Sequence, residues 1–384
     1  MHPKPSTQTP EVISGGSLKA LKLLKGTESR LKTHQGLVGL DGFVDQIIRV
    51  VDKRQADGRT TFISKIPHWT SRIGAAAGKS TKFDLYVQQV KLGGNGPIMA
   101  NAMASFGLSL TCIGNMGWPE PHPVFHPMKA VCKLITIANP CSTDAIEFDD
   151  GKIMLSHQEV AGRVTWKTME RVIGKDKLFR LFDRATFTAL DNWTALPHMS
   201  EIWNQLQRNV CPRFSQKGGQ ARRKMFFDIA DPEFRLVEDI KLALTLITGF
   251  QRWYDTTLGL NQKEADEVCE ILELRMQGSD REMVRRSAEA IRSRLGIHHV
   301  VVHATAFAAA ASKDASTLVE GPFVEKPLIS TGAGDHFNAG YSLGMILDGD
   351  LEQCLQLGVA TSGFYVRTAK SPSLKDLRGF LKKI

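Results

Sequence analysis

The sequence lacks the features that mark membrane-spanning and exported proteins. No apolar run approaches the roughly 18 residues that a membrane-spanning helix requires. The N-terminal stretch MHPKPSTQTPEV has no apolar core of the kind that an export signal needs. We therefore expect a cytoplasmic protein without a membrane partner.

Cysteine is sparse and irregularly spaced. The cysteines lie far apart and include no CxxC pair, so their spacing indicates neither a metal site nor a disulfide framework. Free buried thiols in a reducing compartment are the expectation. The six positions are Cys112, Cys132, Cys141, Cys211, Cys269 and Cys354.

Acidic residues are outnumbered by basic ones, which gives a net charge of +9. This excess favours an anionic partner, such as a nucleotide or a sugar phosphate, only weakly. The basic residues are scattered, and the densest group, Arg222 to Lys224, leads directly into an apolar run. We read that group as a loop before a strand and expect no nucleic-acid partner.

Short apolar runs alternate with amphipathic segments along most of the chain. This alternation is typical of an α/β fold with a parallel sheet covered on both faces. We assign residues 1–35 to an N-terminal tail, disordered over 1–16, and a peripheral helix, and residues 36–384 to one domain. The expected strands lie within 36–51, 108–117, 132–138, 185–193, 224–232, 244–250 and 298–307.

The segment 142–160 departs from that rhythm. Its apolar and polar residues alternate with period two around Asp149, Asp150 and Gly151, which predicts a β-hairpin. Strands within 44–92 and 141–160 are expected to form a small β lid over a site.

The glycine-rich stretch GAAAGKS, Gly74 to Ser80, resembles a phosphate-binding P-loop only superficially. A P-loop has four residues between its first glycine and the Gly-Lys-Ser/Thr, whereas three intervene here and Ile73 occupies the required glycine position. No strong apolar strand precedes the stretch. The sequence predicts a small-residue loop.

A second glycine-rich stretch is KLGGNGPIMANAMASFG. Its glycines, including Gly93 and Gly94, let the backbone approach another group closely. The stretch is either a plain turn from strand to helix or the floor of a substrate pocket that also uses Asn95.

The third stretch is STGAGDHFNAG. Gly332 and Gly334 allow a sharp turn whose N–H groups point outward, and the helix that follows adds the positive end of its dipole. Asp335 is then either a helix cap or the base that receives a hydroxyl proton during phosphoryl transfer. The stretch alone leaves both open.

The order of these pieces resembles that of the PfkB-type carbohydrate kinases of the ribokinase-like superfamily, from about Gly36 to Lys370. The most specific match is GAGD followed by Phe337, Ala339 and Gly340, similar to that family's GAGDxFxAG. The resemblance implies a three-layer α/β/α sandwich with a mostly parallel central sheet and a small β lid. It also implies an ATP- and Mg²⁺-dependent phosphotransferase acting on a primary hydroxyl of a sugar or sugar-like alcohol.

The same resemblance implies roles for individual residues. Asp335 would be the catalytic base, and Gly332, Ala333 and Gly334 would form the anion hole. Asp45 matches the carboxylate that grips sugar hydroxyls, with Asp41 as a second candidate. The glycine turn would complete the substrate site with Gly93, Gly94 and Asn95.

Asn261 and Glu264 are similar to the family's N-x-x-E motif, which organises the Mg²⁺ carried by the nucleotide. A helix capping box would look much the same. Asp228 matches a strand-end aspartate to which we assign no role. By resemblance, adenine is expected near residues 357–361. The further nucleotide contacts that the resemblance implies are His303, Thr305, Thr331, Ala360 and Thr361.

The sequence departs from the family at three places. Ile329 and Ser330 replace the usual Asp-Thr, which puts activation by potassium in doubt, and Ile98 replaces an Asn of the glycine signature. The nucleotide loop HATAFA, with Thr305 and Ala308, lacks the usual glycines. We therefore expect altered nucleotide contacts.

Three alternatives to an ATP-dependent sugar kinase stay open. Nucleoside kinases share these motifs, and GGNGPIMANAMA also looks like the corresponding segment of ADP-dependent sugar kinases. The altered nucleotide loop leaves room for a catalytically silent ligand-binding member of the fold. Lid strands of family members often pair across a dimer, so a homodimer is a further expectation.

Overall fold

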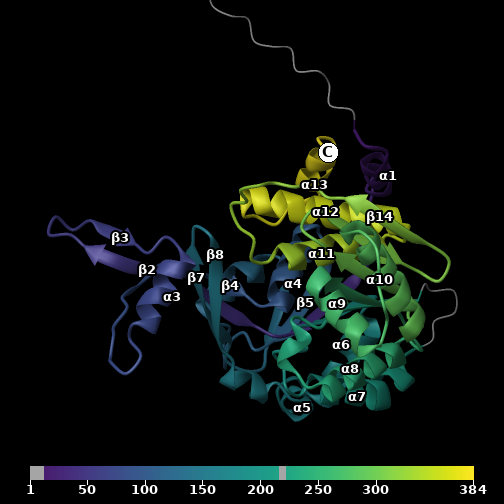
Figure 1. Ribbon diagram of the computed structural model, residues 1–384. Coiled ribbons are helices and arrows are strands. Elements are labelled where there is room, and N and C mark those ends of the chain that lie inside the picture. Colours follow the sequence, from purple (N-terminus) through teal and green to yellow (C-terminus); the bar gives the residue numbers. More distant parts are fainter. Residues whose placement is uncertain (1–12, 216–221) are drawn as a thin grey trace, which may run out of the picture.

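The chain forms a large α/β body and a smaller β lid that projects from one side of it (Figure 1). The computed structural model describes residues 13–215 and 222–384. Of the expected N-terminal disorder over residues 1–16, residues 1–12 lie outside the described residues. The prediction is wrong at Gly15 and Gly16, which form the start of helix α1 (Gly15–Leu23). The peripheral helix appears as two helices, α1 and α2 (Glu28–Leu31).

The body is built on one large sheet. Its strand order is β14-β13-β12-β11-β10-β9-β1-β5-β6, parallel from β12 to β6, with β13 and β14 antiparallel at one edge. The strands are β1 (Gln35–Leu40), β5 (Ser109–Gly114), β6 (Lys133–Thr136), β9 (Phe187–Asp191), β10 (Arg223–Asp228), β11 (Tyr254–Asn261), β12 (His299–His303), β13 (Phe307–Ala311) and β14 (Ser316–Glu320). The inner strands are apolar along their length because helices cover both faces of the sheet.

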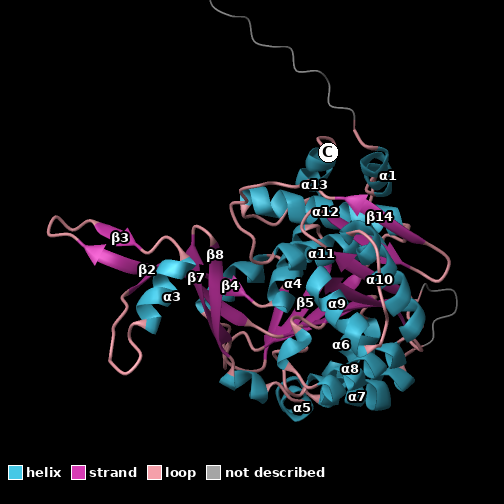
Figure 2. Cartoon of the chain, in the orientation of Figure 1, coloured by secondary structure: helices cyan, strands magenta, loops and turns pink. Residues whose placement is uncertain are grey.

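Helices pack on both faces of this sheet (Figure 2). One face carries the core formed with α1, α4 (Asn95–Ser105), α11 (Ala333–Ile346), α12 (Leu351–Thr368) and α13 (Leu374–Leu381). The other face carries the core formed with α5 (Trp166–Ile173), α6 (Lys175–Arg184), α7 (Met199–Gln205), α8 (Val237–Phe250), α9 (Gln262–Ile271) and α10 (Asp280–Leu295). The predicted three-layer sandwich is confirmed.

The lid is a second sheet centred on β2 (Phe43–Arg54). That strand pairs with β4 (Leu85–Gly93) and β3 (Thr60–Phe62) in antiparallel fashion and with β7 (Cys141–Phe148) in parallel. The hairpin of β7 and β8 (Gly151–His157) confirms the period-two prediction. A short helix, α3 (Ile66–Gly74), packs its Trp69 against Phe148 of the lid.

The GAAAGKS stretch is not a P-loop. Gly74 ends helix α3, and turns follow it, whereas a P-loop follows a strand. Among the described helices none combines the length and apolar character needed to cross a membrane.

One predicted strand is wrong. Residues 244–250 form the last half of helix α8, and the strand of this region is β11, which starts at Tyr254. A short apolar run does not distinguish a buried strand from the buried side of a helix, because neither shows alternation with polar residues. Here the preceding residues extend the run into a 14-residue helix.

Candidate active site

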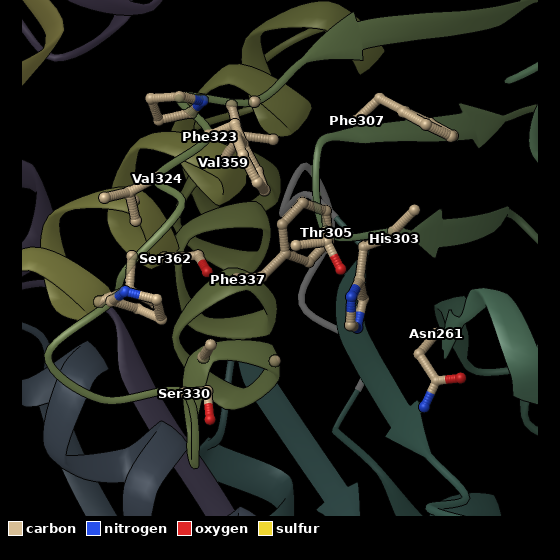
Figure 3. A pocket seen from close by; sticks show the side chains of 18 of the residues that line it. Asn261, His303, Thr305, Phe307, Phe323, Val324, Ser330, Phe337, Val359 and Ser362 are labelled. Carbon is tan, nitrogen blue, oxygen red and sulfur yellow. The ribbon is translucent and has the colours of Figure 1, made fainter. Parts of the chain in front are cut away.

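An apolar cavity of about 440 Å³ opens at the carboxyl end of the large sheet. Figure 3 shows Phe307, Phe323 and Val359 toward one end of it and Ser330 and Asn261 toward the other. The walls come from the ends of β11 and β12, the segment between β14 and α11, and one side of α12. Open α/β sheets generally bind ligands at this edge.

A second, polar cavity of about 780 Å³ lies between the body and the lid. Its lining includes Asp45 of β2 and Thr143 of β7 from the lid, and Asp335 of α11 from the body. Lys263 lines both cavities. The two cavities are therefore neighbours along the edge of the sheet.

The turn from Thr331 to Asp335 separates the two cavities. Thr331 and Asp335 line the polar cavity, whereas Ala333 and Gly334 line the apolar cavity. Helix α11 begins at Ala333, after Gly332 adopts a φ of 91°, a conformation that favours glycine. A group held in one cavity would thus meet a group held in the other at the N-terminus of a helix.

Two buried side chains hold this turn in place. The Tyr365 hydroxyl donates to the Thr331 carbonyl at 2.9 Å, and His336 Nδ1 lies 2.7 Å from the Gly332 carbonyl oxygen. The two rings stack with their centroids 3.6 Å apart. Burial lowers the pKa of His336 to about 4, so its imidazole is neutral at pH 7. The neutral ring can donate a hydrogen bond from Nδ1 to the Gly332 carbonyl and so hold the turn.

The first turn of α11 presents free backbone donors. Among the described residues, no backbone or side-chain group accepts a hydrogen bond from the N–H of Gly334 or Asp335. A methyl group added to Gly334 would approach nothing closer than His303 Cε1, at 3.4 Å, so the backbone is open on the cavity side. Free N–H groups at a helix N-terminus form a binding site for an anion such as a phosphate.

Asp335 lies at the end of the polar cavity with its side chain buried. Burial raises the pKa of this carboxyl well above its usual value, and the carboxylates of Asp228, Asp41 and Asp45 raise it further. The Lys91 ammonium on β4 acts in the opposite direction. A carboxylate with a raised pKa, next to a cavity, is typical of a group that accepts a proton during catalysis.

The glycine turn at Gly93 and Gly94 is shaped around two carboxylates. A methyl group at Gly93 would lie 2.2 Å from Asp45 Oδ1, and one at Gly94 would lie 2.8 Å from Asp41 Oδ2. Asp45, Gly94 and Asn95 line the polar cavity, and Gly93 supports Asp45 from behind. This stretch is therefore more than a plain turn, because it leaves room for a buried carboxylate beside the cavity.

Asp41, the second candidate for sugar binding, is fully buried and does not line the polar cavity. Its carboxylate accepts hydrogen bonds from the N–H groups of Asn95 and Gly96, at 2.9 and 2.8 Å, and from Asn192 Nδ2 at 2.8 Å. Burial raises its pKa to about 6. Asp41 thus caps helix α4 and holds the glycine turn.

Asn261 and Glu264 form a capping box at the start of α9. Asn261 Oδ1 accepts from the Glu264 N–H at 2.9 Å, and Glu264 Oε2 accepts from the Asn261 N–H at 2.8 Å. Glu264 also accepts from the Asp231 N–H at 3.0 Å. Burial and the neighbouring Asp228 raise the pKa of Glu264 to about 8.

Asp228, to which the sequence assigned no role, ends strand β10. It accepts from the Ala230 N–H and from Asn338 Nδ2 of α11, both at 2.9 Å. Through Asn338 it ties the strand to the helix that carries Asp335.

Comparison with known proteins identifies the family. A model of the family "Prokaryotic ketohexokinase" matches residues 24–384. The chain belongs to this family. It is also similar to a ketohexokinase of Haloferax volcanii, with 25% identity over 346 residues that make up 90% of each chain.

Solved structures support the same fold for this family member. A carbohydrate kinase from Agrobacterium tumefaciens superposes with a TM-score of 0.63 at 15% identity, covering 91% of this chain and 98% of that one. Arabidopsis thaliana ribokinase complexed with ribose and ATP superposes with a TM-score of 0.61, also at 15% identity, over 91% and 99% of the two chains. The protein has the ribokinase-like fold and is a carbohydrate kinase, hence a phosphotransferase.

The fold brings three of the seven expected nucleotide residues to the apolar cavity. Asn261, His303 and Thr305 line the apolar cavity, whereas Thr331 lines the polar cavity. Glu264 is buried behind the residues that line the apolar cavity.

Ala360 and Thr361 do not line either cavity, which corrects their assignment as nucleotide contacts. Both side chains are fully buried, and Thr361 Oγ1 donates to the Leu357 carbonyl beside Gly340. They occupy the side of α12 that packs on α11. The residues of α12 that line the apolar cavity are Val359, Ser362, Gly363 and Val366, which share the opposite side of the helix.

Sequence reasoning missed several residues of this sugar kinase that line the polar cavity. Asn192 directly follows β9 and Thr194 lies two residues further on, and this position at the carboxyl end of a parallel strand is a signal that could have identified them. Thr143 and Ser156 of the lid are identified only by the pairing of β7 with β8.

Proposed function

We propose that this sugar kinase transfers the γ-phosphoryl group of ATP to a primary hydroxyl of a ketohexose. Asp335 is the general base, and residues 332–334 with the free N–H groups of α11 form the anion hole. One observation carries the proposal: a single glycine turn contributes bare backbone to an apolar cavity and a buried carboxylate to the adjoining polar cavity.

The apolar cavity suits a nucleotide. Phe307, Phe323 and Val359 at one end supply apolar surface for a base, and Ser330 at the other end supplies a polar group for phosphates. Gly334, which also lines the cavity, adds a backbone N–H. Thr305 and His303 line the middle in place of the glycines usual in the resembling family. In this protein the nucleotide base is bound by stacking and apolar contact instead of by contacts with those glycines.

The polar cavity suits a neutral polyol better than a sugar phosphate. Its lining contains four carboxylates, Asp45, Asp231, Glu233 and Asp335. The one lysine of that lining, Lys263, forms ion pairs at 2.9 Å with Glu233 and 3.5 Å with Asp231. An anionic substrate group would meet like charges there, whereas hydroxyls can donate to the carboxylates. The family to which the chain belongs favours a ketohexose as that polyol.

The reaction proceeds at the turn between the cavities. The hydroxyl oxygen of the sugar forms a bond to the γ-phosphorus as the bond from that phosphorus to the β–γ bridging oxygen breaks, which releases ADP. Asp335 receives the hydroxyl proton, and the N–H groups of Gly334 and Asp335 stabilise the charge on the phosphoryl oxygens. The lid excludes water, which would otherwise accept the phosphoryl group.

Mg²⁺ would enter with the nucleotide. The described residues include no group of three His, Cys, Asp or Glu side chains that could hold a metal ion, so a cage made only of protein ligands is not available. The donor set fits an ion held mainly by phosphates, because Mg²⁺ keeps several waters and few protein ligands in such sites. Asn261 and Glu264 would hold it through water, and the ion would neutralise phosphate charge.

Replacing Glu264 by Gln tests this assignment. Gln has one acceptor oxygen, so it can keep the capping contact with the Asn261 N–H, and with it the start of α9, but it gives up the contact with the Asp231 N–H. The Mg²⁺ concentration that gives half the maximal rate should rise about ten-fold, which is the lower end of the loss in metal affinity seen when a group that supports metal ligands is removed. The sugar KM should not change. Metal titrations at saturating ATP measure it, with Glu270→Gln on the exposed side of α9 as the control. An unaltered titration counts against the role.

The pH profile tests the electrostatics of the base. Asp335 must be deprotonated to act, and its pKa is raised, so kcat should fall on the acid side at a higher pH than an ordinary carboxyl would give. Lys91 lowers this pKa, so Lys91→Met should move the acid limb to still higher pH. The measurement is kcat against pH at saturating substrates, with the exposed Lys53→Met as the control. A limb that stays in place, or moves to lower pH, contradicts the assignment.

A panel of acceptors and donors tests the function directly. Each acceptor is assayed with ATP and with ADP as donor. The acceptors are ketohexoses, aldohexoses, pentoses, ketohexose phosphates, keto-deoxy acids and nucleosides. The proposal expects the highest kcat/KM for a ketohexose with ATP. A nucleoside as the best acceptor, ADP as the better donor, or ligand binding without turnover would each establish one of the alternatives instead.

We also propose that two chains pair through the lid. Strand β4 pairs with β2 alone among the described strands, which leaves its other edge open. The strand exposes Leu85, Tyr86, Val87 and Val90, each by more than two fifths. An open apolar edge of this kind is covered in most native proteins. Sedimentation equilibrium should report twice the chain mass of 42.5 kDa, and a monomer at micromolar concentration contradicts pairing.

We infer from the cysteines that the protein works in a reducing compartment such as the cytoplasm. All six are buried free thiols. Burial raises the pKa of Cys132, Cys211 and Cys354 to about 12, which keeps these thiols protonated and unreactive.

A further inference from the structure

Lys152 of the lid reaches the turn that separates the two cavities. It lies on β8, opposite Glu147 of β7. Its ammonium donates to Ser330 Oγ at 3.3 Å and to Thr331 Oγ1. Ser330 lines the apolar cavity and Thr331 the polar cavity, so the ammonium lies where the two cavities meet.

The charge of Lys152 is poorly compensated in this position. Although Lys152 is an exposed residue of β8, desolvation around its ammonium lowers its pKa, and the neighbouring Lys91 lowers it further. Glu147 and Asp45 act in the opposite direction, yet no carboxylate of the described residues forms an ion pair with Lys152. Two neutral hydroxyls are its partners, and an anionic group at the same place would bind it more strongly.

We propose that Lys152 is a catalytic residue whose ammonium binds an oxygen of the phosphoryl group during its transfer. This inference rests on the proposed function, because it requires the phosphoryl group to pass the turn at Ser330 and Thr331. Lys152 exchanges no proton. As the bond to the sugar oxygen forms and the bond to the bridging oxygen of the nucleotide breaks, its charge stabilises the negative phosphoryl oxygens.

The position of Lys152 also connects lid closure to the reaction. Lys152 belongs to the β7–β8 hairpin, and the same face of the lid carries Asp45, Thr143 and Ser156, which line the polar cavity. Seating the lid over the sugar therefore delivers the cation to the phosphoryl group in the same movement. A nucleotide without a bound sugar would lack this cation, which limits its hydrolysis by water.

Kinetic constants of three variants test the proposal. Lys152→Met should lower kcat by about 100-fold, the range for loss of one group that stabilises transition-state charge. The sugar KM should change by less than about three-fold, because the ammonium acts only on the transferring group. Lys152→Arg should restore part of kcat, and Lys53→Met, an exposed lysine on the same sheet, should leave it unchanged. A Lys152→Met enzyme with at least about one third of the wild-type kcat overturns the proposal.

A binding measurement keeps this test independent of turnover. ADP with aluminium fluoride mimics the phosphoryl group in transfer, and calorimetry with this probe should show at least about ten-fold weaker binding to Lys152→Met than to wild type. ADP alone should bind both equally. Equal affinity for the probe overturns the role of Lys152. If the wild type phosphorylates no sugar, the proposed function fails, and the probe still decides the role of Lys152.

Discussion

Asp335→Asn is expected to leave a folded protein that binds sugar and nucleotide but has almost no turnover. Asparagine keeps the size and polarity of the side chain but cannot take a proton from the sugar hydroxyl. The expected loss in kcat is about 1,000-fold, within the range for loss of a general base. Steady-state kinetics measure the loss, and calorimetry with the sugar and with ADP measures retained binding.

The control for this prediction is Asp314→Asn, in an exposed turn between β13 and β14. It should retain the wild-type kcat. An Asp335→Asn enzyme with more than about one tenth of the wild-type kcat would show a barrier increase under roughly 1.4 kcal/mol, too small for a lost base. That result would mean that another residue is the general base.

Removal of the Asp45 carboxylate should raise the sugar KM by about 100-fold with little change in the nucleotide KM. Asp45 is buried, lines the polar cavity and forms no ion pair with a described residue, so its carboxylate is available to sugar hydroxyls. Two hydrogen bonds from hydroxyls to a charged group, each contributing about 1.5 kcal/mol or more, account for this magnitude. Asp45→Ala, assayed over a ketohexose concentration series, measures it.

Gly93→Ala should reproduce much of this defect without altering the carboxylate itself. The added methyl group would lie 2.2 Å from Asp45 Oδ1, so the carboxylate has to move, whereas the backbone at Gly93 is already acceptable for alanine. Gly74→Ala, with nothing within 4 Å of the added methyl group, is the control. The double variant should match Asp45→Ala alone, since both changes remove the same contact. Additive losses would mean that Gly93 and Asp45 act separately.

The sequence was sufficient to predict the fold, and the place of the turn at residues 331–335 at the centre of the site stays a prediction. The α/β layering follows from alternating apolar runs and amphipathic segments, and the lid hairpin follows from period-two alternation. Where a run was short and apolar throughout, as at residues 244–250, periodicity carried no information and the prediction was wrong. A helix and a buried strand then differ only in what surrounds them.

Individual site residues were harder to predict because their positions depend on long-range pairing. Asp41 and Asp45 are four residues apart, and only the structure shows one capping α4 and the other facing the cavity. Lys91 and Lys152 were missed because they meet the site only through the register of β4, β2, β7 and β8. The phase of helix α12 likewise separates Ser362, which lines a cavity, from the buried Thr361.

The most direct test of the central claim is a crystal structure of the Asp335→Asn variant with ATP, Mg²⁺ and the best ketohexose from the panel. We predict the γ-phosphate on the N–H groups of Gly334 and residue 335, and the primary hydroxyl within about 3 Å of the side chain at 335. A γ-phosphate bound away from this turn, or a hydroxyl held by another acid, would contradict it.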